Sequence, residues 1–217
     1  MSVQASAAHR QGEREAAEDF RGEFVKHVFF LVGAGYDRLV ARRSSLAQAE
    51  EPAITGELHR SIEEYLDSDD APGWADSYTC FDDPPEHSQP GSSPPKLGTH
   101  RPRIDIKFQR NAPRPRPRFR FEAKRLHRNG SIAAYVGSEG LGAFLTRYYP
   151  CAEGVGMLGY VQSGQNDEWA KALQKKLSTC AWQPVALIQN LPHSYKTQHS
   201  LDGQARLTIH HLLLSFA

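Results

Sequence analysis

Hydrophobic residues at helical spacing run through the first fifty positions of the chain. Between residues 13 and 49 they recur at steps of three or four, the period of one helix face: Phe20, Phe24, Val28, Leu31 and Leu39. The Gly33-Ala34-Gly35 stretch is expected to bend or interrupt this helix. Residues 1–12 show no such period and are rich in Ser, Ala, Gln and Arg, so we expect a disordered tail there.

A second helix is predicted from about Thr55, a candidate N-cap behind Pro52. Its apolar stripe contains Leu58, Ile62, Tyr65 and Leu66. Glu57 falls in its first turn, beside that stripe. The next segment, residues 68–100, has clusters of Asp, Pro and Gly and no apolar period, which predicts a long flexible surface loop.

Two short stretches of alternating apolar and polar residues follow, at about 103–109 and 117–125, and predict a pair of strands. The later elements are, in chain order, a helix capped by Ser138, a fully buried strand in the run GVGMLGYVQS, a helix over about 167–178 and a hairpin around Asp202-Gly203. This order predicts an α/β fold with a mixed central β-sheet flanked by helices and a C-terminal β-hairpin. At 217 residues the chain fits one domain, over residues 13–217.

Charge is distributed unevenly along the chain, although its formal net charge is only +1. Residues 50–90 hold twelve Asp and Glu against one Arg, whereas residues 101–128 hold eleven Lys and Arg against Asp105 and Glu122. A block this basic normally faces phosphate. The plain alternative is a solvated basic hairpin.

The three cysteines, Cys80, Cys151 and Cys180, have no paired spacing. The polar, charged N-terminus does not have the pattern of a secretory leader. Together with the odd number of cysteines, this predicts reduced thiols and a cytoplasmic location. The longest apolar run, Val28 to Val32, is far shorter than the ~20 residues of a membrane span. We therefore expect a soluble protein with no membrane partner.

The candidate chemistry lies in the two carboxylates of the basic block. Asp105 is in the first predicted strand, while Glu122 and Lys124 share one face of the second, because side chains alternate along a strand. Two carboxylates in close range repel each other unless a cation lies between them, and oxygen ligands suit Mg²⁺ or Mn²⁺. Such an ion can activate water for attack on a phosphodiester. The alternative is a structural ion pair.

These residues resemble the motif of the PD-(D/E)XK nuclease family, which has the restriction-endonuclease-like fold. The similarity covers about residues 54–165 in element order and rests on Asp105 and on Glu122-Ala123-Lys124. Ile104 stands where the family usually has proline. The resemblance implies a metal site at Asp105, Glu122 and Ala123, a water-positioning role for Lys124 and assistance from Glu57.

The resemblance also implies a function, a Mg²⁺- or Mn²⁺-dependent endonuclease that hydrolyses DNA by activated-water attack. Small nucleases of this kind often act in bacterial defence against phage or plasmid DNA, so an ATPase or other defence-system subunit is an expected partner. A homo-oligomer is left open. From the residues alone, two other classes stay open, a non-catalytic nucleic-acid-binding subunit and a module that binds a protein partner through its charged blocks.

Several further residues are candidates for substrate binding. Those expected to contact nucleic acid are Arg114, Arg116, Arg118, Arg125, Lys196 and His199. The first three alternate with prolines that hold the turn extended, as a stiff arm whose arginines suit a phosphate backbone. Gln162, at the end of the buried strand, is either a polar helper of the active site or a strand-end amide.

Other motifs are less specific. VGAGYDRL and GSEGLGAF lack both phosphate-loop patterns, and VGSEG has Val136 where a hydrolase elbow needs Gly, so Ser138 is interpreted as a cap. His210 and His211 are neighbours in a strand and point to opposite faces, so they cannot share one metal ion.

Overall fold

The computed structural model describes residues 2–42, 46–84, 103–128, 130–146, 154–185, 191–201 and 205–217. Its helices are α1 (Ser2–Arg42), α2 (Glu51–Leu66), the 3-10 helix η1 (Gly73–Ser77), α3 (Ser131–Val136), α4 (Leu141–Leu145) and α5 (Asn166–Lys176). Its strands are β1 (Tyr78–Asp82), β2 (Ile106–Arg110), β3 (Arg118–Leu126), β4 (Val155–Val161), β5 (Gln183–Pro184), β6 (Ser194–Leu201) and β7 (Ala205–Ser215).

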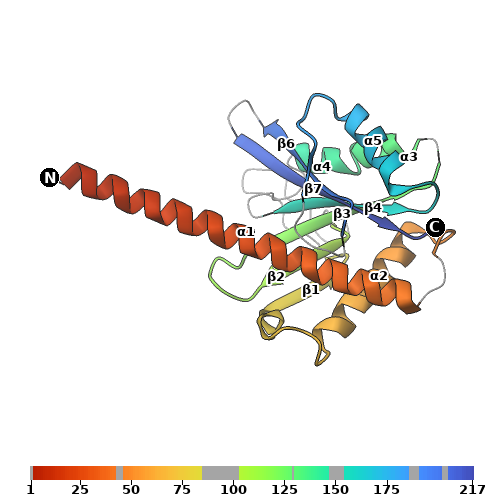
Figure 1. Cartoon of the computed structure of the whole chain (residues 1–217), viewed down its shortest axis with the longest axis horizontal. Helices are drawn as coiled ribbons and strands as arrows, with labels where there is room; N and C mark the ends of the chain where they lie inside the picture. Colours follow the sequence, from red (N-terminus) through yellow and green to blue (C-terminus); the bar gives the residue numbers. More distant parts are fainter. Residues whose placement is uncertain are drawn as a thin grey trace, which may run out of the picture.

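In the described part of the chain, seven strands form one mixed sheet in the order β1-β2-β3-β4-β7-β6-β5 (Figure 1). The central strands β3, β4 and β7 are parallel, and their outer neighbours are antiparallel. Helices α1 and α2 cover one face, and α3, α4 and α5 cover the other. The predicted α/β class, mixed sheet and terminal β6–β7 hairpin are confirmed, although residues 202–204 of its turn lie outside the described residues.

Alternation along the central strands divides their side chains between the two cores. In β4, which is buried at every position as predicted, Tyr160 packs under α1 and α2 while Met157 packs under α3, α4 and α5. In β3, Ala123 belongs to the α1–α2 core. Its neighbours Glu122 and Lys124 therefore face the α3 side of the sheet, as the sequence pattern indicated.

Helix α1 differs from its prediction at both ends. It begins at Ser2 and so includes residues 2–12, for which the sequence predicted a disordered tail. It also continues through Gly33-Ala34-Gly35 without a break to Arg42. A Cβ added at Gly35 would collide with Ile62 of α2, so this glycine permits the close approach of two helices.

Helix α2 begins one turn earlier than predicted, at Glu51, with Pro52 in its first turn. Proline is well tolerated there because the first N–H groups of a helix have no intrahelical partner. Thr55 is not the cap. It is buried, and its Oγ1 lies 3.0 Å from the hydroxyl of Tyr160 in a side-chain hydrogen bond.

The predicted loop over residues 68–100 is wrong in its first half, where η1 and β1 form. Strand β1 pairs with β2 and buries Tyr78 and Cys80. The sequence did not predict this strand, because its five residues, which lie between segments rich in Asp, Pro and Gly, are too few to show an alternating pattern. Residues 85–100 lie outside the described residues. The helix expected from Ser138 is replaced by two short helices, α3 and α4, with Ser138 in the turn between them.

Candidate functional site

The site forms where strand β2 leaves its neighbour β3. The two strands are paired only as far as Ile106 and Phe121, so the later residues of β3 have a free edge on that side. Asp105, immediately before β2, fills the gap: its Oδ2 accepts a hydrogen bond from the N–H of Ala123 at 2.6 Å. One predicted site residue thus replaces a missing strand as the acceptor for the backbone of β3.

Glu51 also accepts a backbone hydrogen bond from the free edge of β3, at the next outward-facing N–H group. Its Oε2 accepts a hydrogen bond from the N–H of Arg125 at 3.1 Å, two residues beyond Ala123. Its other oxygen, Oε1, accepts from Lys124 Nζ at 2.9 Å. The first residue of α2 is thereby fixed beside the predicted site.

Lys124 joins the carboxylates of the site. Its Nζ also lies 3.3 Å from Oε1 of Glu122, and its side chain is only 14% exposed. Burial lowers the pKa of Lys124, but the charges of Glu122 and Glu51 outweigh that effect and raise the pKa above its ordinary value. The lysine is therefore a fixed positive charge at neutral pH.

Asp105 is held in a different electrostatic balance. Burial raises its pKa, and neither the hydrogen bond from Ala123 nor the charge of Lys124 cancels the rise, while Glu51 adds to it. Three carboxylates thus surround one ammonium group. An excess of negative charge in a partly buried place is the electrostatic condition that a divalent cation neutralises.

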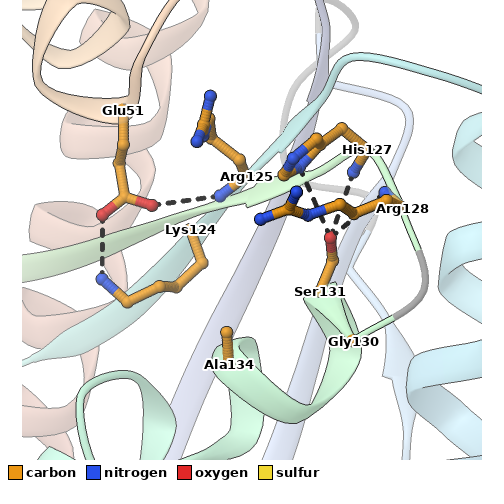
Figure 2. A pocket seen from close by; sticks show the side chains of 8 residues that line it. All are labelled: Glu51, Lys124, Arg125, His127, Arg128, Gly130, Ser131 and Ala134. Carbon is orange, nitrogen blue, oxygen red and sulfur yellow. Dashed lines mark hydrogen bonds and ion pairs between the residues drawn. The ribbon is translucent and has the colours of Figure 1, made fainter.

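A cleft opens beside this cluster. Two adjoining hollows of about 340 and 370 Å³ share Glu51, Lys124 and Ala134, so the cleft lies between the beginning of α2, the end of β3 and helix α3. Figure 2 shows Glu51 and Lys124 on one side of it and His127 and Arg128 on the other, above α3. Of the cluster, Glu51 and Lys124 therefore face a cleft that is open to a ligand.

The far side of the cleft is basic. Arg125 lies near the end of β3, and His127 and Arg128 follow directly after the strand. Ser131 Oγ accepts the N–H groups of His127 and Arg128 at 3.3 Å each. Burial lowers the pKa of His127, and the charges of Arg125 and Arg128 lower it further. Arg125, a predicted nucleic-acid contact, also pairs with Glu50 at 2.7 Å.

The acidic helper from α2 is not where the sequence interpretation placed it. Glu57 lies six residues beyond Glu51, roughly 9 Å further along the helix axis. There its Oε2 accepts a hydrogen bond from Arg60 at 2.6 Å. The acidic contact with Lys124 comes from Glu51 instead. The sequence signal for this position was Pro52, because proline is favoured in the first turn of a helix and so marks Glu51 as the helix start.

Gln162 supports the site from behind. Its side-chain N–H groups donate to the carbonyls of Leu46 and Ala49, at 2.7 and 2.8 Å. The two carbonyls belong to the segment that leads into α2. Gln162 is 5% exposed. The described contacts make it a positioning residue for the beginning of α2 and hence for Glu51.

The arginine-rich turn lies at the other end of β3. Arg114 and Arg116 are exposed, and Arg118 Nε donates to Gln109 Oε1 at 3.2 Å. Eight residues of strand separate Arg116 from Lys124, which corresponds to roughly 25 Å. The structure therefore does not bring these arginines to the candidate metal site.

Strand β6 carries the other two predicted contacts, three strands away from β3. Lys196 is partly exposed. His199 is only 8% exposed, and its ring nitrogens contact Thr197 Oγ1 at 2.8 Å and Cys180 Sγ at 3.4 Å. The predicted phosphate contact of His199 is therefore wrong, because its ring is buried and already bonded within the protein. The sequence around His199 does not indicate this burial, which results from tertiary packing.

His210 and His211 point to opposite faces, as expected. His210 packs edge-on against Phe29 of α1, and His211 Nδ1 contacts the hydroxyl of Tyr135 in α3 at 3.0 Å.

No protein-family model matches this chain, and no curated protein or solved structure is similar enough to count as a match. Among the described residues, no helix combines the length and the apolar character that crossing a membrane requires.

Proposed function

We propose that the chain is a metal-dependent endonuclease of the PD-(D/E)XK type, with the restriction-endonuclease-like fold. One observation carries the proposal. At the point where β2 leaves β3, the carboxylates of Asp105, Glu122 and Glu51 gather at the edge of β3 beside Lys124, and Glu51 and Lys124 line an open cleft. Two separate elements each supply an acidic side chain to the free edge of β3. A structural ion pair needs one carboxylate, not three.

The donor set fits Mg²⁺ or Mn²⁺. All of its candidate ligands are oxygens, the ligand type that these ions prefer. The backbone of Ala123 belongs to the same edge, since its N–H faces Asp105 and strand alternation places its carbonyl on that side too. Asp105, Glu122 and the Ala123 carbonyl would hold the ion, which supplies charge stabilisation and a water of lowered pKa.

The protein's own groups account for the remaining steps. The charged ammonium of Lys124 is held by Glu51 and Glu122, so it donates hydrogen bonds from a fixed position to a water or a phosphate oxygen. Arg128 and Arg125 on the basic side of the cleft attract the phosphate backbone. Together these groups orient a phosphodiester beside the carboxylates, which leads to hydrolysis by water.

The direct test is cleavage of plasmid DNA by the purified chain with Mg²⁺, with and without EDTA. We expect cleavage with Mg²⁺ and none with EDTA, and single-stranded RNA is the comparison substrate. A matched pair of variants sharpens the test: Glu51→Gln should reduce the rate by at least about tenfold, whereas Glu57→Gln on the same helix should leave it unchanged. The opposite ranking would return the assisting role to Glu57.

The second candidate is a non-catalytic nucleic-acid-binding subunit. The exposed Arg114 and Arg116, far from the cleft, favour it. It predicts DNA binding that does not depend on Mg²⁺ and no cleavage under any metal condition.

A further inference from the structure

A second group of ligand-type side chains lies between helix α2 and the edge strand β1, apart from the cleft. His59 and Glu63 are four residues apart on α2, so they occupy the same face of the helix. Cys80 lies in the middle of β1 and is 4% exposed. The donor atoms of these three residues all lie within 4.8 Å of one another.

The imidazole of His59 points to a missing ligand. Its Nε2 is buried and has no hydrogen-bond partner in the described part of the chain. A buried polar atom without a partner costs about 1–3 kcal/mol, so such atoms are rare in folded proteins unless a water or an ion fills the place. A metal ion is one such partner, and it is the partner that also suits a thiol and a carboxylate.

Electrostatics favour a cation at this point. Cys80 is almost completely buried and the carboxylate of Glu63 lies within 4.8 Å of its thiol, so burial and the neighbouring negative charge both disfavour two bare anions at this point. Glu63 forms no ion pair with any residue that the structure describes. A cation between the two groups offsets both effects, because it stabilises the thiolate and the carboxylate together.

The donor types select the metal. Thiolate and imidazole are the ligands of Zn²⁺, whereas Mg²⁺ prefers oxygen alone. Zinc bonds of about 2.0–2.3 Å in a tetrahedral site place the donors roughly 3.5 Å apart. The donor atoms, which lie within 4.8 Å of one another, therefore need to approach by up to about an ångström when the ion binds. Glu63 is partly exposed, so a water has access as the fourth ligand.

We propose that His59, Glu63 and Cys80 bind one Zn²⁺ ion, which fastens helix α2 to the edge strand β1. The ion has a structural role. Helix α2 begins with Glu51, and β1 pairs with β2, which begins next to Asp105. The zinc site thus links α2, which carries Glu51, to the strand pair β1–β2, which begins at β2 next to Asp105, but it does not depend on the proposed nuclease activity.

The test measures zinc binding in excess Mg²⁺, which occupies oxygen-only sites. Purified chain is stripped of metal and titrated with Zn²⁺ by calorimetry, and the bound zinc is counted by elemental analysis. We expect one ion per chain and a rise in Tm of about 5–10 °C at 100-fold excess over Kd. Cys80→Ser and His59→Gln should each weaken binding by at least about 100-fold.

The control is Cys180→Ser, which removes the other thiol in contact with a histidine. It should bind zinc as the unmodified chain does. Circular dichroism of each variant without metal verifies that it is folded, and His59→Gln serves if Cys80→Ser does not fold. The proposal is overturned if the unmodified chain binds no zinc, or if either folded variant binds it as tightly.

Discussion

Replacing Lys124 by methionine tests whether the lysine is held between carboxylates. The change keeps the length of the side chain and removes the ammonium that lies 2.9 Å from Glu51 and 3.3 Å from Glu122. Removing one partner of a fully buried pair costs about 3–5 kcal/mol, and an exposed pair is worth about 0–1 kcal/mol. The three side chains are 14%, 25% and 10% exposed, so the expected loss is about 2 kcal/mol.

The assay is unfolding in urea and by heat, first in EDTA. A loss of about 2 kcal/mol lowers the Tm by roughly 4–8 °C in a chain of this size. Saturating Mg²⁺ should then stabilise the variant more than the unmodified protein, because its carboxylates have lost the ammonium group of Lys124. Cleavage should be absent in both conditions. The exposed Lys175 on α5 provides the control, Lys175→Met. If both variants lose the same small amount of stability, the reasoning about the cluster fails.

Three further changes give separate outcomes. Asp105→Asn should stabilise the metal-free protein at neutral pH. A carboxyl whose pKa is raised on folding contributes stability below its ordinary pKa of 3.8, and this stability is lost as pH rises through the folded value; equal stability curves from pH 3 to 8 would contradict this. Gln162→Leu should cost about 1–2 kcal/mol in urea unfolding, since it removes the side-chain donor of the Leu46 carbonyl and one of the two side-chain donors of the Ala49 carbonyl, which keeps Arg125; a loss below about 0.5 kcal/mol would show that water replaces the amide. Changing Arg114, Arg116 and Arg118 together to Ala should weaken DNA binding at all sequences and flatten its salt dependence, with cleavage at saturating DNA retained; unchanged affinity with lost stability would assign the turn to a contact within the protein.

The sequence predicted the elements whose patterns are local. Strands β2 and β3 alternate visibly, and the run that forms β4 is apolar throughout, so the central sheet and the placement of Glu122 and Lys124 on one face followed directly. The proximity of Asp105 to that edge also followed, because two consecutive short strands usually pair.

The remaining features depend on tertiary packing. Glu51 was missed because Thr55 has the chemistry of a cap, yet Thr55 is used for a buried hydrogen bond with Tyr160. His199 was assigned to the surface because nothing in its neighbours indicates that the sheet buries it. The zinc-type cluster joins two elements about twenty residues apart in the sequence, a spacing that matches no metal motif.

In the proposed mechanism the carboxylates at the β2–β3 junction bind a metal ion that activates water for cleavage of DNA. The most direct measurement compares plasmid cleavage by the unmodified chain and by Glu122→Gln, in one buffer with Mg²⁺, after circular dichroism has shown equal folding. We expect EDTA-sensitive cleavage by the unmodified chain and a loss of at least about a thousandfold in the variant. Equal rates for the two proteins, or cleavage that persists in EDTA, would contradict it.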